Sequence, residues 1–480
     1  MRETSEEAVS DEEARAADLG SSRQLDLDRM ALSEDGRAAI EHLLERLEAD
    51  EGRKRKRRAD DRHRLRATLE AIVLDLYALA KARPGDWLAY SRNKTSYTEK
   101  SRYQTPAASQ RTVTASADFL TRAGLAEHAP GYYERIPFAT MTAGRGYRSR
   151  LRTTSALIGL LEDKYGLRPA DVGFRPGAEV VRLKGKARGR TGPKPLLEYV
   201  DTDETNHMRE SLRRINALLQ EAELSLDEAA VAAAHGAHED DAVELQNEER
   251  PFAGDFSARR LYRVFNNGSW KEGGRFYGGW WMAVHKAMRP HILIDGEPTI
   301  ELDFKGLHPR LCYHMAGRPL AEESDPYAVA NYPRDLVKKA FNQLLNSTPE
   351  MRLRAPAGAD KALKGAPYRN LLAAVQEAHR PIQDWFRAGR GLRLQNWDSR
   401  IAKKVLDFLS RRGIVALPVH DSFIVQRRHE RVLGETMSLA YRGLVSTLTD
   451  RPALPVIRGW SSRAVEEDVQ GRLLDAEGRP

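Results

Sequence analysis

Two aspartates, each at the end of an apolar strand pattern, are the residues of this chain best suited to chemistry. Asp421 follows Leu417-Pro-Val-His420 at the tip of an expected β-hairpin, and Asp303 closes the alternating stretch Thr299–Phe304. Mg²⁺ prefers oxygen ligands and usually binds one or two carboxylates plus substrate phosphates. Two such ions about 4 Å apart stabilise both the attacking and the leaving oxygens of a phosphoryl displacement. The pair therefore predicts a two-Mg²⁺ site, with Mn²⁺ as the alternative ion.

A basic helix is expected between the two aspartates, over residues 334–346. Its polar residues recur every four positions and share one broad face; they are Arg334, Lys338, Asn342 and Asn346. Two cations on such a face can hold a triphosphate, and Lys338 can protonate a departing pyrophosphate. The alternative is an ordinary solvated face with an ordinary surface lysine.

The elements around the aspartates follow from local patterns. Lys305-Gly306 should turn the chain after Asp303, and Pro309 fits the first turn of the next helix. Residues 398–409 predict an amphipathic helix that ends before Gly413. A strand then leads to His420-Asp421, and Ile424 and Val425 begin the return strand. A helix N-cap role for Asp303 is the alternative.

Before residue 200 the pattern resembles a winged helix. Leucines and an isoleucine at spacings of three and four predict a helix over about 65–79, and Ser109–Gly124 predicts a second helix. A short strand, a Gly/Arg-rich loop over 143–152 and a returning strand follow. In a winged helix the second helix enters a DNA groove and the wing lies on the backbone. The expected phosphate contacts are Arg111, Arg145, Arg148 and Arg150; a small helical domain with a solvated loop is the alternative.

The bulk composition favours a nucleic-acid partner. The 480 residues carry a formal net charge of +8, and a basic balance favours a polyanion. The alternative is a soluble, arginine-rich protein. Cys312 is the single cysteine, which excludes disulfides within the chain and a thiolate zinc site. The chain shows no secretory signal pattern and no apolar run of membrane-span length, so we expect a cytoplasmic protein without membrane contact.

The motifs resemble those of family A DNA polymerases. Asp303-Phe-Lys-Gly-Leu-His-Pro-Arg310 is similar to motif A, Arg334-x-x-x-Lys338 to motif B, and Val419-His-Asp-Ser422 to motif C. The Ser-Phe after Asp421 is closer to single-subunit phage-type RNA polymerases, which share the same palm. Gly273-Gly-Arg-Phe-Tyr-Gly278 resembles the segment whose arginine meets the primer-template minor groove. The resemblance covers roughly residues 260–430.

The resemblance implies a fold and a set of roles. The fold class is α+β, a right-hand palm of antiparallel sheet and helices with reduced fingers, preceded by a winged-helix-like domain. The metal ligands would be Asp303, Phe304 and Asp421, with Asp303, Asp421 and Lys338 catalytic. Nucleotide contacts would come from Arg334, Lys338, Asn342, His308 and Asn346. His420 would lie near the primer terminus and Arg275 near the duplex, while Arg310 would brace the palm.

Three positions depart from the family pattern. His308 replaces the motif A glutamate that helps exclude a 2′-hydroxyl, and Asn342 and Asn346 replace an aromatic residue and a tyrosine of motif B. The preference for deoxynucleotides or ribonucleotides therefore cannot be transferred.

The expected organisation has five parts. Residues 1–60 form a disordered charged tail, 61–200 the winged-helix-like domain, 201–250 a helix and linker, 251–465 the palm and fingers, and 466–480 a flexible tail. The main hypothesis is a DNA polymerase that extends a primer with nucleoside triphosphates on a DNA template, with RNA as the alternative nucleic acid.

Three other functions stay open. The first is a single-subunit-type RNA polymerase or a primase-like enzyme. The second is a non-catalytic DNA-binding replication or regulatory protein of a mobile element. The third is a metal phosphohydrolase, which would need further ligands from His285, His291, His314 or His379. The oligomeric state does not follow from the sequence.

Overall fold

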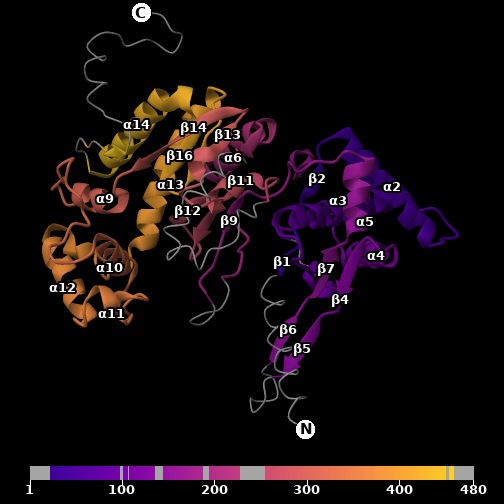
Figure 1. Cartoon of the computed structure of the whole chain (residues 1–480), viewed down its shortest axis with the longest axis horizontal. Helices are drawn as coiled ribbons and strands as arrows, with labels where there is room; N and C mark the ends of the chain where they lie inside the picture. The colour runs from indigo at the N-terminus through magenta and orange to yellow at the C-terminus, as the bar shows by residue number, and fades with distance from the viewer. Residues whose placement is uncertain are drawn as a thin grey trace, which may run out of the picture. The chain divides into compact units, whose positions relative to one another are not determined.

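The chain forms two compact units that each collect separate segments of sequence (Figure 1). Unit 1 contains residues 1–179, 233–260 and 278–285, and unit 2 contains 180–232, 261–277 and 286–480. The computed structural model describes residues 22–97, 101–105, 107–135, 144–187, 194–227, 255–449, 453 and 455–458. Its mixed helices and several sheets confirm an α+β fold at that coarse level. The expected boundaries at 200 and 250 are wrong, because residues 180–232 pack with the C-terminal unit.

Unit 1 packs helices against a four-stranded sheet. The helices are α2 (Glu34–Asp50), α3 (Ala59–Ala82), α4 (Gln110–Arg122) and α5 (Ser155–Gly159). The sheet runs in the order β1 (Arg23–Gln24), β3 (Leu88–Tyr90), β7 (Ser149–Thr153) and β4 (Ala126–Ala129). Two further antiparallel pairs join β2 (Arg29–Ala31) to β8 (Val172–Phe174) and β5 (Tyr132–Arg135) to β6 (Gly144–Tyr147).

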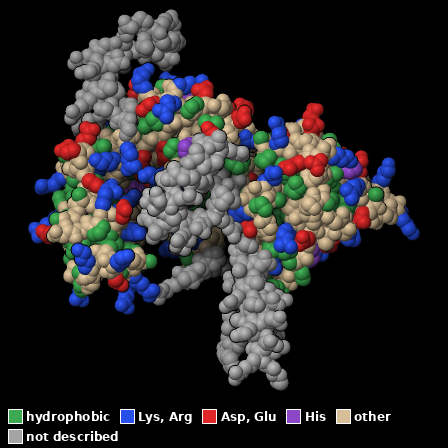
Figure 2. Space-filling model, in the orientation of Figure 1, with side chains coloured by type: hydrophobic (Ala, Val, Ile, Leu, Met, Phe, Trp, Pro, Cys, Tyr) green, Lys and Arg blue, Asp and Glu red, His purple; other side chains and the backbone are tan. Residues whose placement is uncertain are grey.

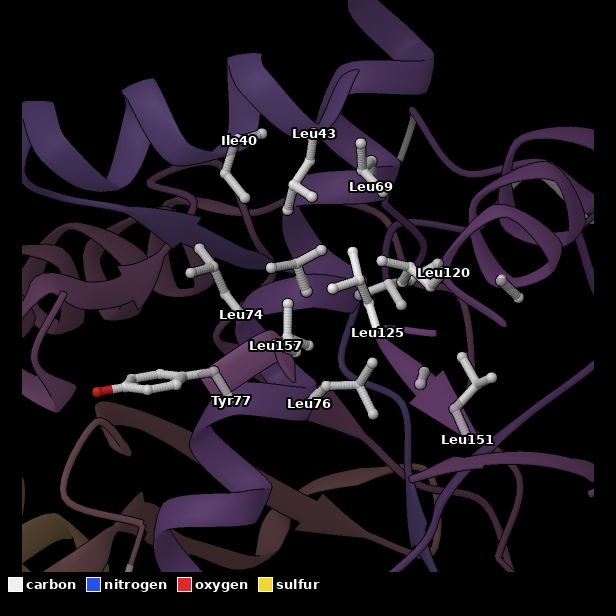
Figure 3. Packing of buried hydrophobic residues seen from close by; sticks show 14 of the residues in the cluster. Ile40, Leu43, Leu69, Leu74, Leu76, Tyr77, Leu120, Leu125, Leu151 and Leu157 are labelled. Atoms are coloured by element: carbon white, nitrogen blue, oxygen red, sulfur yellow. The ribbon is translucent and has the colours of Figure 1, made fainter. Parts of the chain in front are cut away.

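The core of unit 1 forms around α3. All the residues whose spacing predicted this helix are buried, as are α2 side chains such as Ile40 and Leu43. Figure 3 shows such side chains in one cluster with Leu120 of α4 and Leu151 of β7. Ser109 caps α4 through the N–H of Thr112, which fixes where the second predicted helix begins.

The disordered tail expected over residues 1–60 is wrong from residue 22 onward. From Ser22 onward the chain contributes β1, β2 and α2 to unit 1. The stripe Ala39, Ile40, Leu43, Leu44 and Leu47 is buried, so a charged sequence still carries one apolar helix face. Residues 1–21, most of the linker expected before residue 250, and the tail expected over 466–480 lie outside the described residues.

Unit 2 is built on an antiparallel sheet. Its strands run in the order β10 (Leu224–Leu226), β13 (Ile292–Ile294), β14 (Glu297–Phe304), β16 (Ser422–Gln426) and β15 (Leu417–Val419), and β17 (Ile457–Arg458) also pairs with β14. Helix α14 (Glu430–Thr449) packs on β14 and β16, and contacts α9 (Leu307–Met315) and α13 (Gly391–Arg411). The predicted strand-turn-helix and hairpin are thus both present.

Two smaller groups complete unit 2. A second sheet, most of it in this unit, has the order β12 (Ser269–Gly279), β11 (Arg259–Asn266), β9 (Val181–Leu183), and α6 (Asp203–Glu221) packs on α13. Helices α10 (Arg334–Asn346), α11 (Ala359–Ala362) and α12 (Tyr368–Ala378) lie together at one end of the unit (Figure 1). The apolar residues of α10, opposite its polar face, are all buried; they are Leu336, Val337, Ala340, Phe341, Leu344 and Leu345.

The turn after Asp303 requires glycine. Gly306 has φ +64°, and a Cβ there would lie 2.9 Å from Cγ of Pro326. We expect Gly306→Ala to lower the free energy of unfolding by about 1–2 kcal/mol, since a left-handed backbone strains any residue with a Cβ. Urea denaturation followed by circular dichroism measures this. Gly177→Ala, where a Cβ meets nothing within 4 Å, is the matched control and should change stability little.

Candidate active site

The pairing of β14 with β16 brings the two predicted aspartates to neighbouring strand ends. Asp303 lies opposite Ser422, the residue directly after Asp421. The backbone N–H of Phe304 lies 3.5 Å from the carbonyl oxygen of Asp421. His420, at the hairpin tip, has φ +58°, a conformation that non-glycine residues seldom adopt. The pairing register of β14 and β16 therefore brings together two aspartates that are far apart in the sequence.

The Asp303 carboxyl resists ionisation. Its side chain is 30% exposed. Burial, and then the nearby Asp421 carboxylate, raise the pKa of Asp303 from 3.8 to about 7, although Arg458 and Lys338 oppose the shift. Two carboxylates held this close repel when both are ionised. A cation between them would relieve that repulsion.

Arg458 is a site residue that the sequence analysis missed. It lies on β17, where its backbone pairs with Asp303, and its Nη2 atom lies 3.6 Å from Oδ2 of Asp303. A two-residue strand leaves no readable pattern in the sequence. This exposed guanidinium partly neutralises Asp303, and Lys305 N–H donates to the carbonyl of Val456 in the same segment.

The two predicted cations of helix α10 lie beside Tyr327. The guanidinium of Arg334 and the ammonium of Lys338 lie 5.4 and 5.9 Å from the centre of the Tyr327 ring. Burial, followed by the Asp421 charge, raises the pKa of the Tyr327 hydroxyl well above its usual value. Arg334 also donates to Asp325 at 2.6 Å. The two predicted cations therefore share one aromatic neighbour that feels the Asp421 charge.

The other two predicted residues of α10, Asn342 and Asn346, lie in its C-terminal half. Asn342 is partly buried, whereas Asn346 is exposed at the end of the helix. The Asn346 side-chain amide donates to the carbonyl of Asn342 at 2.8 Å. A Cβ at Gly391 would collide with Oδ1 of Asn346, so this amide packs against the start of α13.

Asp398 is the second missed residue, and it holds two predicted ones. It lies on α13 and is 2% exposed. Arg275 donates from Nε at 3.0 Å to Oδ2, and His308 Nε2 lies 2.8 Å from the same oxygen. A buried carboxylate needs such partners, because an unpaired buried charge costs several kcal/mol. Sequence periodicity does place residue 398 on the same stripe as the buried Ala402 and Val405.

This network changes what Arg275 and His308 offer. Both were predicted to contact nucleic acid or nucleotide, but here each is bound to Asp398. His420 stays exposed at the hairpin tip. Partial desolvation of the imidazole, and then the charge of Arg275, lower the pKa of His420, so the neutral form is favoured.

The residue after Asp421 has a structural partner. The Ser422 hydroxyl donates to the Glu301 carboxylate on β14, and Arg289 Nε lies 3.0 Å from the same carboxylate. Ser422 therefore fixes Glu301 beside the two aspartates. Arg310 is buried and donates to five backbone carbonyls, in line with a bracing role; they belong to Lys305, Leu320, Ala321, Glu322 and Ser324.

Metal ligands beyond the aspartates do not gather in the part of the chain that the structure describes. No group of three or more His, Cys, Asp or Glu side chains there could hold an ion. His314 is buried against Tyr441, and His379 against Tyr313. A phosphohydrolase site of several histidines thus finds no support among these residues. Phe304 could offer only its backbone carbonyl, since its buried side chain carries no donor atom.

The arginines of unit 1 that were predicted to contact phosphates differ in exposure and in the contacts they already make. Arg111 is exposed on the first turn of α4. Arg148 is exposed and donates to Gln24 at 2.6 Å, and the Arg150 guanidinium lies 5.1 Å from the Trp87 ring centre. Arg145 lies on β6, and its side chain falls outside the description.

The β5–β6 hairpin also displays tyrosines that the sequence analysis did not single out. Tyr132 and Tyr133 are 46% and 58% exposed, and Tyr132 stacks on Tyr147 with ring centres 4.7 Å apart. On the face drawn in Figure 2, Lys and Arg side chains are interspersed with Asp and Glu over both units. The basic balance is therefore not gathered into one patch on that face.

Comparisons with known proteins give a distant likeness. No protein-family model and no curated protein sequence matches the chain. Among solved structures, the chain is similar to the POL domain of Pol1 from M. smegmatis in complex with DNA primer-template and dNTP. Sequence identity is 11%, the TM-score is 0.28, and the match covers 90% of this chain and 66% of that one. None of the described helices is long and apolar enough to cross a membrane.

Asp303→Asn should change stability in a pH-dependent way. Since the folded pKa, about 7, exceeds 3.8, the folded chain binds this proton more tightly and wild-type stability falls as pH rises between the two values. The variant lacks that loss. We expect it to be more stable than wild type by roughly 1–2 kcal/mol above pH 7, after discounting for exposure, and equal below pH 4. Thermal unfolding in EDTA across this range measures it; a pH-independent difference would contradict it.

Asp398→Ala should destabilise unit 2. The change leaves the Arg275 guanidinium without its buried partner, at a cost of about 3–5 kcal/mol in unfolding free energy. Urea denaturation measures the loss. Asp384→Ala, at an exposed position, is the control and should cost less than about 0.5 kcal/mol. Equal losses in the two variants would show that Asp398 is not a structural centre.

Proposed function

We propose that the chain is a template-directed nucleotidyltransferase, a DNA-polymerase-like enzyme that extends a primer with nucleoside triphosphates. The observation that carries the proposal is the β14–β16 register, which sets Asp303 and Asp421 side by side with a raised pKa on Asp303. The motifs around both aspartates and around Arg334 and Lys338 resemble those of family A polymerases in the same order. Perturbed carboxylates of this kind are typical of catalytic sites.

The donor set fits Mg²⁺. Asp303 and Asp421 would hold the ions, and Glu301 adds negative charge beside them. Magnesium needs few protein ligands, because water and substrate phosphates complete its octahedron. When bound, the ions supply charge neutralisation at the attacking and leaving oxygens. The repulsion that raises the Asp303 pKa is the feature such cations would remove.

The protein's own groups would then act as follows. A primer 3′-hydroxyl would lose its proton to water and attack the α-phosphorus, the bond from phosphorus to the bridging oxygen would break, and pyrophosphate would leave. Arg334 and Lys338, both exposed on α10, bind the triphosphate oxygens. Lys338 gives a proton to the pyrophosphate as its charge develops. The α10–α12 group would be the reduced fingers, and the β14–β16 sheet the palm.

Unit 1 would hold the nucleic acid. Its strand order β3-β7-β4, with α4 before β4 and the β5–β6 hairpin before β7, is the arrangement expected of a winged helix. The hairpin would be the wing. Exposed tyrosines there can stack on bases, and Arg148 can contact phosphates.

A non-catalytic DNA-binding protein is the second candidate. The ion pair between Arg458 and Asp303, and the capture of Arg275 by Asp398, favour it. In such a protein, Arg458 would take the place of a metal ion beside Asp303, and the Asp398 carboxylate would take the place of the duplex as the partner of Arg275. RNA synthesis is a variant of the first candidate, because His308 replaces the glutamate that helps exclude ribose.

The deciding experiment is primer extension with dNTPs and NTPs in separate reactions, with Mg²⁺ or Mn²⁺. We expect incorporation by wild type and a loss of at least about 10³-fold in Asp303→Asn and Asp421→Asn, equivalent to roughly 4 kcal/mol of transition-state stabilisation. Lys338→Ala should lose about 10²-fold through its proton transfer.

The control is Glu297→Gln. Glu297 lies on β14, as Asp303 does, but its carboxylate pairs with Arg428. The variant should extend primers like wild type. DNA affinity of Asp303→Asn should stay within about twofold, since metal ligands contribute little to backbone contacts. Specific DNA retention by a wild-type protein that incorporates neither nucleotide set would instead establish the second candidate.

A further inference from the structure

A small basic pocket lies in unit 1, within the part of the chain that the structure describes. It has a volume of about 190 Å³ and lies between the segment after α2, the first turns of α3 and the start of α4. Typical pockets for drug-sized ligands hold about 300–1,000 Å³. The space is therefore suited to one small group rather than to a whole nucleotide.

Four arginines line this pocket. They are Arg53, Arg57, Arg64 and Arg111, and the carboxylates of Glu51 and Asp61 also face it. Four cations against two carboxylates leave an excess of positive charge. Glu51 is moreover neutralised, because Arg57 Nη2 donates to both of its oxygens at 2.5 Å. Arg53, Arg64 and Arg111 are all exposed at the rim.

Arg57 is the buried member of the set. Its side chain is 9% exposed. Its Nη1 atom is buried and has no hydrogen-bond partner among the described residues, although a Glu48 oxygen lies at 3.7 Å. A buried guanidinium N–H without an acceptor carries a free-energy cost that a ligand oxygen would remove.

The start of α4 adds donors at the same place. Ser109 and Thr112 line the pocket, and their capping box occupies the Thr112 N–H. The N–H groups of Gln110 and Arg111 begin the helix without an intrahelical partner. Helix starts favour anions, and arginine binds phosphate oxygens in a two-pronged way.

We propose that this pocket binds a phosphate group. The cavity, the four-arginine lining and the unsatisfied Arg57 Nη1 carry the inference together. The ligand is a phosphate monoester or diester, supplied by a nucleic acid or by a small phosphorylated molecule. The site belongs to unit 1 alone and does not depend on the polymerase proposal.

The first test is calorimetric titration of the full chain with inorganic phosphate at constant ionic strength. Wild type should bind, and Arg64→Ala/Arg111→Ala should bind at least about tenfold more weakly. The matched control is Arg55→Ala/Lys56→Ala, which removes two exposed cations from the same segment that do not line the pocket. It should stay within about twofold of wild type, since neither side chain lines the pocket and their charges reach it only through screening solvent.

A second pair of variants separates this pocket from α10. Arg334→Ala/Lys338→Ala should keep the phosphate affinity, whatever its effect on nucleotide incorporation. Arg64→Gln/Arg111→Gln removes both charges but keeps part of each aliphatic stem and a polar end, so it should also bind phosphate at least about tenfold more weakly even if the alanine pair folds poorly. No binding by wild type, equal losses in the pocket and control pairs, or loss only in the α10 pair would each overturn the proposal.

Competition identifies the source of the phosphate. If a nucleic acid supplies it, a 5′-phosphorylated oligonucleotide should displace inorganic phosphate from wild type. The matching 5′-hydroxyl oligonucleotide then shows whether internal diesters suffice. If neither oligonucleotide competes while inorganic phosphate still binds, the pocket serves a small phosphorylated molecule, and the phosphate chemistry of the proposal stands.

Discussion

The antiparallel register of β14 and β16 is the constraint on which the candidate site depends. Opposing Asp303 to Ser422 places Asp421 one residue beyond the paired strands. A slip of one residue would turn the side chains of a strand to the opposite face. The apolar residues of these strands hold the register, since Leu302 and Phe423 are paired and almost fully buried. Core packing thus sets the distance between two charged groups.

Asp398 provides a second electrostatic centre within the same unit. It collects Arg275 from β12 and His308 from α9, so three elements meet at one buried carboxylate. The two aspartates at the strand ends repel, whereas this carboxylate is satisfied. The repulsion between Asp303 and Asp421 is unfavourable in the folded chain, whereas the ion pairs of Asp398 stabilise the fold. The aspartate pair is suited to receiving a ligand, and Asp398 to positioning its neighbours.

Local patterns predicted the elements that carry the aspartates better than the contacts around them. The β14 turn and α9, the buried side of α10 and the hairpin at His420 followed from spacing, because each depends on near neighbours. Arg458 and Asp398 did not, since their roles arise from residues distant in sequence. The domain boundary was wrong for the same reason. Residues 180–232 belong to unit 2, and tertiary packing rather than local pattern decides this.

The segments of the two units alternate along the sequence, and this affects how the chain can fold during its synthesis. Arg29 is buried near the start of unit 1; it pairs with Asp255, and its Nη1 donates to the hydroxyl oxygen of Ser257 at 2.7 Å. Translation adds residues one at a time from the N-terminus, so these partners emerge only after a long stretch that belongs to unit 2. On the ribosome, the N-terminal core can therefore pair the Arg29 guanidinium with Asp75 alone, 3.1 Å from Arg29 Nε, and its remaining partners arrive only with later sequence.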